Sequence, residues 1–439
     1  MKSVHAVLIG LAVIASPISS FPASAAPATP AASATDALAD AIARRASGPF
    51  EDFYASRGYR PLWIDGRIIG ADAQAFLKIL DDAALDGLKP SRYKAQRLRK
   101  AIAEADSGDA DALARAEVDL TRAFVRYVQD ARRTRNVGVD YADLALKPRK
   151  QSPERVLRAA VLGKSFGDYV RSMGWMSPHY VEMREILRTA LAQRLDAHVI
   201  DTIRFNRERA RHLPPASVRH IVVDAASAQL WYYQAGKEVG TMKVVVGAQA
   251  TQTPLLVGSL NYAIVNPYWN VPDYLIRDNV ARKILGGRTL ASMHMEALSD
   301  WSATPAVLDP ATIDWQAVST GQQAIRLREL PGPHNSMGDV KFVFPNDHGI
   351  YLHDTPNRDL FRKDDRHLSN GCIRLEKAWV LGRWMMGKAL DDRPKTKAPE
   401  IAIPMPATVP VYLTYLTVMR TKSGVAIRPD VYGLDQAKR

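Results

Sequence analysis

The sequence predicts an α+β protein, with a helical first half and a second half that is rich in β-strands. Apolar residues recur at helical spacing from Asp36 to about Asn136. Near Arg219 the pattern changes to short strand-like runs that are separated by glycine and polar residues. This change of period divides the chain into two structural halves.

The N-terminal segment has the pattern of a secretory signal. Lys2 is the only charged residue among the first 25, an apolar run extends from Ala6 to Ala15, and Ala23-Ser24-Ala25 offers a cleavage site. The run is too short to cross a bilayer as a helix. We therefore expect a signal peptide at residues 1–25, an Ala/Pro/Ser linker at 26–35 and a periplasmic protein. An uncleaved anchor is the alternative, and it would also leave the domains outside the inner membrane.

Two helical segments precede the β-rich half. Residues 36–140 form a helical domain, in which Asp86-Gly87 is placed to end a helix. Residues 141–213 form a helical connector, whose helices open at Ser152-Pro153 and Ser177-Pro178, where serine caps and proline takes the first turn. The first segment gathers no set of acid, base and nucleophile, so we assign no chemistry to it. Its helical face includes Leu120, Phe124, Tyr127 and Ala131.

The β-rich half extends from residue 214 to residue 439. A more helical insertion is predicted at 277–320 and a helix at 376–388. Gly236 marks a hairpin between two of the first strands. The predicted strands are Ile221–Asp224, Gln229–Tyr233, Val239–Val246, Val409–Val418 and Gly424–Arg428.

The chain is basic, with 59 lysines and arginines against 46 acidic residues. A basic surface favours anionic partners, including nucleic acid, acidic wall polymers and lipid head groups. An exported protein rarely meets nucleic acid, and no basic stripe with interleaved aromatic residues is found, so we expect no nucleic-acid partner. The dense basic run Arg204–Arg211 is interpreted as a solvated helix face.

Cys372 is the single cysteine of the chain. An exported protein usually keeps its cysteines as disulfide pairs, and a lone thiol cannot form an internal one. A catalytic role is therefore weighed against an inert, buried cysteine that acts as a small apolar residue.

His353 precedes Cys372 by 19 residues and is a candidate base for the thiol. A thiol is only slightly ionised at neutral pH, so acyl transfer needs an imidazole within hydrogen-bond reach. Gly371 lets the backbone approach a substrate closely, and the N–H groups around Gly371 and Cys372 can form an oxyanion hole.

Two further histidines, His348 and His367, compete with His353 for this role. On one strand, His348 and His353 would face opposite sides. Composition alone does not choose among the three. A metal site with these histidines and Asp354 is the other reading, but their spacing matches no familiar zinc pattern, so we expect neither metal nor cofactor.

The motif around these residues resembles the signature of the L,D-transpeptidase catalytic domain, in its large periplasmic Gram-negative subtype with an N-terminal scaffold domain. Tyr351-Leu-His-Asp-Thr-Pro356 and Ser369-x-Gly-Cys-x-Arg374 carry this resemblance. Further similar stretches are Asn266–Pro272, Pro331–Asn335, Val340–Asn346 and Asp430–Gly433, and, in the helical front, Phe53-Tyr54 and Pro61–Gly66.

The resemblance implies a peptidoglycan acyltransferase with a role in wall biogenesis and cell shape. Cys372 would be the nucleophile, His353 the general base and then acid, and Gly371 part of the oxyanion turn. Arg374, Asn370, Ser369 and Tyr351 would bind substrate. Family members release terminal D-alanine from a stem tetrapeptide, form a thioester on cysteine and transfer it to the side-chain amine of a diaminopimelate residue. Residues 277–320 would form a capping subdomain, and carbapenems would acylate the cysteine.

The sequence departs from the family at Asn370, where a histidine is usual. An amide does not exchange protons near neutral pH, so a lost proton carrier would impair the acceptor step. We favour the milder reading, in which asparagine shapes the turn by hydrogen bonding. A wall-binding scaffold with a decayed site, and attachment of an outer-membrane protein through its amine, are the alternative functions. The sequence leaves the oligomeric state open.

Overall fold

The computed structural model describes residues 34–163, 165–391, 397–422 and 424–435. The expected signal peptide lies outside these residues, as does all of the expected linker except Ala34 and Thr35, which begin the first helix. Within the described ranges, no helix is both long enough and apolar enough to cross a membrane.

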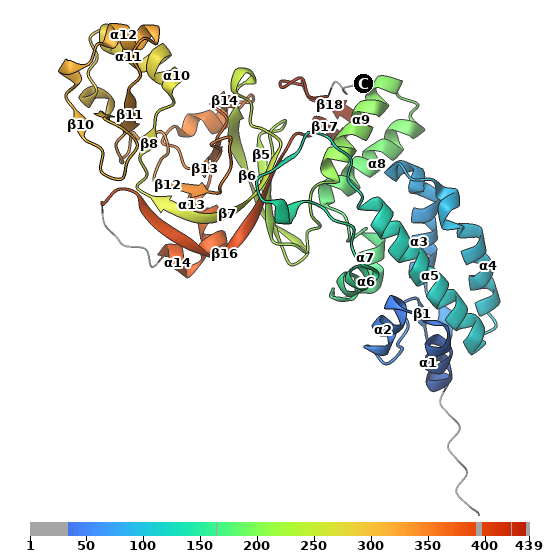
Figure 1. Ribbon diagram of the computed structural model, residues 1–439. Helices are drawn as coiled ribbons and strands as arrows, with labels where there is room; N and C mark the ends of the chain where they lie inside the picture. The colour runs from blue at the N-terminus through green and yellow to red at the C-terminus, as the bar shows by residue number, and fades with distance from the viewer. Residues whose placement is uncertain (1–33, 164, 392–396, 423, 436–439) are drawn as a thin grey trace, which may run out of the picture.

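The front half is a bundle of helices around one long central helix, α5 (Ala110–Ala131) (Figure 1). The face of α5 that the sequence predicted to be apolar is fully buried. The other elements of this bundle are α1 (Ala34–Arg45), α2 (Pro49–Ala55), β1 (Ile64–Asp65), β2 (Ile68–Ile69), α3 (Ala71–Asp81), η1 (Asp82–Asp86), η2 (Pro90–Tyr93) and α4 (Ala95–Ala105). The predicted helix that carries Phe76 and Leu80 is α3, which ends at Asp81. The 3₁₀ turn η1 continues it, and Gly87, with φ of 72°, ends that turn at the position where the stop was predicted.

A buried carboxylate holds the two stretches of this front half that resemble the family. Glu117 of α5 accepts hydrogen bonds from the Tyr54 hydroxyl at 2.6 Å and from the N–H groups of Leu62 and Trp63 at 2.7 and 3.0 Å. Burial raises the pKa of Glu117, and these three donors oppose that shift. The stretches Phe53-Tyr54 and Pro61–Gly66 are thus fastened to the central helix.

The connector contains the short 3₁₀ helix η3 (Leu144–Leu146) and the α-helices α6 (Pro153–Val161), α7 (Phe166–Arg171), α8 (Pro178–Ala192) and α9 (Ala197–Ala210). Ser152 and Ser177 cap α6 and α8 by accepting hydrogen bonds from the N–H groups of Arg155 and Tyr180, which confirms both predicted helix starts. A two-residue strand, β3 (Asp140–Tyr141), lies ahead of these helices and joins the sheet of the second half. It is too short to leave a pattern in the sequence.

The interpretation of Arg204–Arg211 as a solvated helix face is wrong for most of its arginines. Only Arg204 is exposed, whereas Arg207, Arg209 and Arg211 are 3%, 2% and 2% exposed. Arg209 donates to Asp435 at 2.7 Å and to the Tyr415 carbonyl at 3.0 Å, both in the β-rich half. Helix α9 lies between the two halves, and its buried arginines pair with Asp435 of the β-rich half and with Glu208 of α9 itself.

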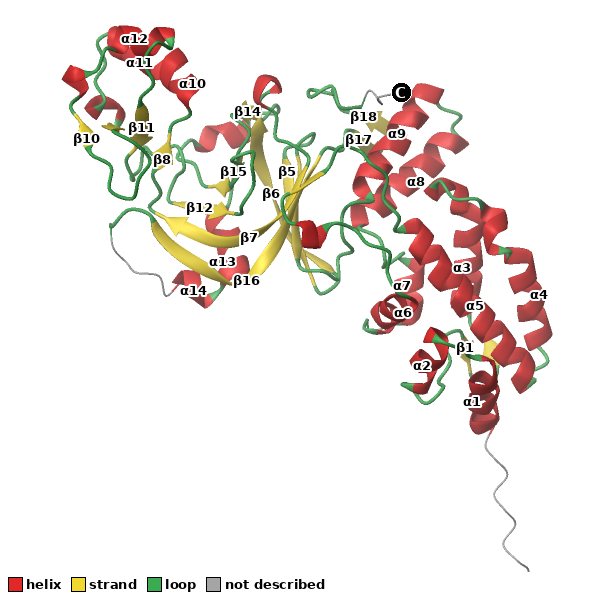
Figure 2. Cartoon of the chain, viewed as in Figure 1, coloured by secondary structure: helices red, strands yellow, loops and turns green. Residues whose placement is uncertain are grey.

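The second half is built around a closed sheet. The strands follow the order β12-β13-β15-β6-β5-β4-β16-β7-β3, and β12 also pairs with β7, so eight of them close into a barrel (Figure 2). The bounds are β4 (His220–Asp224), β5 (Gln229–Gln234), β6 (Lys237–Gly247), β7 (Leu256–Val265), β12 (Val340–Val343), β13 (Leu352–His353), β14 (His367–Ser369), β15 (Ile373–Leu375) and β16 (Ile401–Thr414). The predicted first strands, the Gly236 turn and the helix near 376–388, seen as α13 (Ala378–Met386), are confirmed.

The insertion predicted at 277–320 is more helical than the rest of the β-rich half, as expected, but it is part of a mixed subdomain that also contains strands. Its strands β8 (Trp269–Asn270), β9 (Met295–Leu298), β10 (Val307–Leu308) and β11 (Arg326–Glu329) form a separate antiparallel sheet. Around them lie α10 (Asp273–Leu275), the π-helix η5 (Ile276–Val280), α11 (Ala281–Leu285) and α12 (Trp315–Thr320). The subdomain has its own apolar core and therefore extends from about 269 to 329. Strands of two to four residues give too little alternation to be predicted.

The C-terminal segment returns to the connector. The hairpin β17 (Val418–Thr421) and β18 (Gly424–Ile427) packs against α8 (Figure 1). The two halves therefore share a contact through both α9 and this hairpin.

Candidate active site

Strand register brings the predicted site residues onto one face of the barrel. In the parallel pair β13 and β15, Leu352 lies opposite Ile373 and His353 lies opposite Arg374. Leu352 and Ile373 are fully buried in the barrel core. Because successive side chains alternate, His353 and Arg374 point to the other face, together with Tyr351 and Cys372, which come two residues earlier.

Only one of the three candidate histidines lies on this face. The His353 ring is 6.0 Å from that of Tyr351, and its Nδ1–H donates to the Asp354 carbonyl at 2.6 Å. His348 is exposed and lies 2.9 Å from Asp140 of β3. Both ring nitrogens of His367 are engaged, with the Asp365 carboxylate and the Ala225 carbonyl. The hydrogen bond at Nδ1 leaves Nε2 of His353 able to accept a proton.

The resting thiol and imidazole are both neutral. Burial lowers the pKa of His353 to about 3, and the charges of Arg374 and Lys341 add to that effect. Burial also raises the pKa of Cys372 to about 11, although hydrogen bonds from Tyr351 and the charge of Arg374 oppose it. The thiol is partly exposed and lies 3.5 Å from the Gly349 carbonyl. The site therefore holds a protonated thiol and an unprotonated imidazole on the same face.

The capping subdomain reaches the site from the other side. Burial raises the pKa of the Tyr274 hydroxyl on α10. A negative charge on the nearby Cys372 adds to that shift, so the two side chains lie close together. Burial raises the pKa of the Glu329 carboxyl on β11. The charge of the nearby Arg374 guanidinium opposes this shift in part. Nε of Arg374 is buried and has no hydrogen-bond partner among the described residues. The arrangement leaves a cationic donor beside the thiol, which suits a carboxylate ligand.

A hydroxyl on each side fixes the turn before the cysteine. Ser369 Oγ donates to the Cys372 carbonyl at 2.6 Å and accepts from the Gly371 N–H at 3.2 Å. Thr253 Oγ1 donates to the Gly371 carbonyl at 2.7 Å and accepts from the Gly247 N–H at 2.9 Å. Gly371 has a φ of +109°, a conformation that other residues rarely adopt. The conformation of the turn therefore requires glycine at position 371.

The hydrogen bonds of this turn leave one donor available. The Gly371 N–H is engaged by Ser369, whereas the Cys372 N–H has no partner within the described ranges. Of the two N–H groups that the sequence suggested for an oxyanion hole, only that of Cys372 is therefore open to a ligand.

The positions of Asn370 and Ser369 differ from those expected. Asn370 is exposed, and its side chain makes no hydrogen bond to any residue that the structure describes. Ser369 is 3% exposed and lies inside the turn, so it supports the backbone and is not open to a substrate. Ser369 and Thr253, and not Asn370, hold the shape of the turn.

Several supporting residues could not be found from the sequence. They lie in the loop after β6 and near the C-terminus, more than 50 residues from Cys372. Thr251 Oγ1 donates to the Ser369 carbonyl at 3.0 Å, and the Tyr432 hydroxyl donates to the Gly247 carbonyl at 2.6 Å. A Cβ on Gly247 would lie 2.1 Å from the Thr251 carbonyl oxygen, so this loop needs glycine there. The motif Asp430–Gly433 is the one sequence signal that pointed to this region.

The residues proposed for a metal site do not converge. Asp354 accepts from Arg358 at 2.9 Å, while each histidine has the separate partners described above. Across the described part of the chain, no group of three or more His, Cys, Asp or Glu side chains is placed to hold a metal ion.

Comparison with known proteins agrees with this arrangement. The model of the L,D-transpeptidase catalytic domain matches residues 218–399, and that of a scaffold domain matches residues 49–187. The chain carries an L,D-transpeptidase catalytic domain. A candidate L,D-transpeptidase of Haemophilus influenzae is 28% identical to it over 393 residues, which are 87% of this chain and 77% of that protein. The transpeptidase domain follows a helical scaffold domain, as the sequence motifs predicted.

Solved transpeptidase structures match only part of the chain. An L,D-transpeptidase from Mycobacterium smegmatis is 12% identical, with a TM-score of 0.22 over 45% of this chain and 58% of its own. One from Enterococcus faecium is 16% identical, with a TM-score of 0.19 over 44% of this chain and 49% of its own. The match therefore spans about half the length of these solved chains.

Proposed function

We propose that this protein is a peptidoglycan L,D-transpeptidase in which Cys372 is the nucleophile and His353 its base. The observation that carries the proposal is the shared face of β13 and β15, on which thiol, imidazole and guanidinium lie beside an unengaged N–H. Acyl transfer needs these groups together.

The residues suit the following steps. His353 Nε2 takes the thiol proton as the sulfur attacks the carbonyl carbon of the third residue of a stem tetrapeptide. The Cys372 N–H stabilises the oxyanion, the C–N bond to D-alanine breaks, and His353 returns the proton to the leaving amine. A diaminopimelate side-chain amine then attacks the thioester, His353 accepts its proton, and the thiolate leaves and is reprotonated, forming the cross-link.

The opposed pKa values support a concerted proton transfer. With the thiol pKa near 11 and the imidazole pKa near 3, an ion pair is unfavourable in the free site. The proton therefore moves as the sulfur attacks, when the developing charge on the substrate oxygen is stabilised. Arg374, which lies close enough to Glu329 of the cap to feel its charge, is suited to orient a carboxylate of the stem peptide.

Acylation by imipenem, the carbapenem bound in one solved L,D-transpeptidase structure, tests the proposal directly. We expect intact-protein mass spectrometry to show an adduct of one imipenem on the native protein. Cys372→Ala should lose the adduct completely, and His353→Gln should slow its formation by about 10²- to 10⁴-fold, the usual contribution of a general base. An adduct that persists in Cys372→Ala contradicts the assignment.

The acceptor and the location are tested in cells. We propose that the protein acts in the periplasm on peptidoglycan stem peptides and that diaminopimelate is the acceptor. Muropeptide analysis of deletion and overexpression strains should show cross-links between two diaminopimelate residues that follow the dose of the protein. Enrichment of peptide-linked outer-membrane protein would instead identify a protein amine as acceptor. A native protein that forms no adduct but sediments with sacculi would indicate an inactive scaffold.

A further inference from the structure

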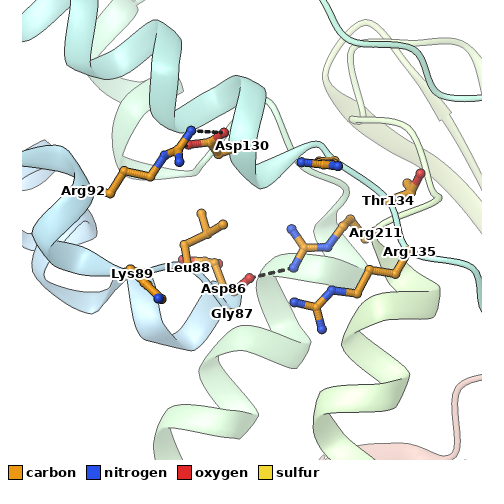
Figure 3. Close-up of a pocket in the computed structure, with 10 residues that line it drawn as sticks. Asp86, Gly87, Leu88, Lys89, Arg92, Asp130, Thr134, Arg135 and Arg211 are labelled. Carbon is orange, nitrogen blue, oxygen red and sulfur yellow. Dashed lines mark hydrogen bonds and ion pairs between the residues drawn. The ribbon is translucent and has the colours of Figure 1, made fainter.

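A second, strongly basic hollow lies on the helical half of the molecule. It is enclosed by the η1–η2 corner, the C-terminal end of α5 and the end of α9, and none of its lining residues belongs to the barrel (Figure 3). Its volume is about 470 Å³. We call it the basic hollow, and its charged lining residues are Lys89, Arg92, Arg133, Arg135, Arg211, Asp86 and Asp130.

The two carboxylates of the basic hollow are already neutralised. Asp130 accepts from Arg92 at 2.9 Å, and Asp86 is held by the buried Arg184 at 3.0 Å. Lys89, Arg133 and Arg135 are exposed, and no carboxylate in the described part of the chain lies within ion-pair distance of them. The hollow therefore carries an excess of positive charge that no carboxylate of the described residues balances.

The walls of the basic hollow are held in place by buried hydrogen bonds. The Arg211 side chain is 3% exposed and bonds to Glu208 at 2.9 Å. It also donates to the carbonyls of Asp86, at 2.8 Å, and Ala131, which end η1 and α5. Two guanidinium groups lie near this corner, since a Cβ on Gly87 would be 3.2 Å from Arg207 Nη2 and 3.5 Å from Arg135 Nη2. Like charges held this close repel one another, so an anion placed between them would be stabilised.

The positive surface continues on both sides of the basic hollow. Two neighbouring hollows share Arg92 with it, and one of them also shares Arg133. The further basic residues are Lys94, Arg97, Arg122 and Arg126 in the first, which also contains Asp119 near Arg97 and Arg122, and Arg132, Arg149 and Lys150 in the second. A track of this kind suits a polymer with repeated anionic groups better than a single small anion.

The track lacks the features of a membrane-binding surface. Surfaces that insert into lipid combine basic residues with exposed large apolar or aromatic side chains. No exposed large hydrophobic residue lines any of the three hollows. The anionic groups it fits are therefore those of a hydrophilic polymer.

We propose that the basic hollow and its two neighbours bind the carboxylates of peptidoglycan stem peptides, as a docking site separate from Cys372. The choice of polymer rests on the proposed function, since stem peptides carry free carboxylates at regular intervals along a strand. Docking there raises the local concentration of strands near the catalytic domain.

Co-sedimentation with purified sacculi tests the docking site. All binding proteins carry Cys372→Ala, so that no acyl transfer occurs. The test variant adds Lys89→Glu, Arg133→Glu and Arg135→Glu. The matched control adds Lys78→Glu, Lys100→Glu and Arg155→Glu, three exposed bases of the same half that line none of the hollows and change the net charge equally. We expect the test variant to bind at least about tenfold more weakly than the control, and sacculi whose carboxylates are amidated to lose binding by the unsubstituted protein.

Equal binding by the test and control variants would overturn the docking site, as would unchanged binding to amidated sacculi. Preferential binding to phosphatidylglycerol vesicles would overturn it in favour of a lipid surface. The same two triple substitutions, made with Cys372 intact, should both form the imipenem adduct at the native rate. If the native protein forms no imipenem adduct, the proposed function is refuted but the docking site is not. If only the test variant fails to form the adduct, that variant is misfolded. The binding comparison is then repeated with the double variant Arg133→Gln, Arg135→Gln.

Discussion

Ser369 and Asn370 are neighbours, and the structure predicts opposite consequences for changing them. Ser369→Ala removes two hydrogen bonds, to the Cys372 carbonyl at 2.6 Å and from the Gly371 N–H at 3.2 Å, in a buried turn. Each lost hydrogen bond costs about 1 kcal/mol, and more where the remaining partner stays buried without water. We therefore expect a loss of about 2–4 kcal/mol in the free energy of unfolding.

The same change should slow acylation of Cys372. The free Gly371 N–H and the loosened Cys372 backbone disturb the one N–H that is open to an oxyanion. If about 1.4–2.8 kcal/mol of this lost stabilisation is added to the activation free energy of acylation, the reaction with imipenem slows by about 10- to 100-fold. Asn370→His lies on the surface and breaks no contact, so its effect should stay within about 0.5 kcal/mol, or about twofold in rate.

Both rates are measured as second-order constants for imipenem, from time courses of the intact mass, with thermal unfolding as the measure of folding. The native protein and Asn370→Ala complete the series, because alanine removes the amide without adding an imidazole. Acceleration by Asn370→His of tenfold or more would refute our reasoning, since it would mean that position 370 takes part in proton transfer. A native rate in Ser369→Ala would refute it equally.

Three further predictions follow from the same contacts. With the thiol pKa near 11, the rate of alkylation of Cys372 by iodoacetamide should rise about tenfold per pH unit from pH 7 to pH 10, because the thiolate fraction rises in the same way. A rate that is already constant above pH 7 would instead indicate a thiolate–imidazolium pair. Thr253→Val leaves the buried Gly247 N–H and Gly371 carbonyl unpaired, so chemical denaturation should show a loss of about 2–4 kcal/mol, and imipenem acylation should slow with it; Thr253→Ser, which keeps the hydroxyl, serves as control. Arg209→Ala breaks a buried ion pair with Asp435 and should destabilise the protein by about 3–5 kcal/mol, whereas Arg204→Ala, at an exposed pair, should cost less than about 1 kcal/mol.

Much of the fold could be predicted because its signals are local. The α5 face repeats every three to four residues, Ser152 and Ser177 directly precede the prolines of their helices, and Gly236 lies in a hairpin turn. These features depend on neighbours in the chain, which the sequence displays. The capping subdomain was predicted less well, because strands as short as β8 and β10 are stabilised by tertiary pairing and not by their own pattern.

The arginines of α9 show the limit of composition as a guide. A run such as Arg204–Arg211 usually indicates a solvated face. Here the helix lies between two domains, and carbonyls and carboxylates far away in the sequence accept its hydrogen bonds. Whether such a charge is exposed is decided by packing.

The sequence by itself determined the helical front, the β-rich back, the lone thiol and the motif that relates the chain to the L,D-transpeptidases. These properties are written in local spacing and in residue identity. Only the tertiary structure decided which histidine shares a face with Cys372, because that depends on the register between β13 and β15. It also decided that Ser369 and Thr253 hold the turn while Asn370 faces solvent, and that scattered bases gather into the basic hollow. Hydrogen bonds and charges act over a few ångströms in space, and the sequence does not contain those distances.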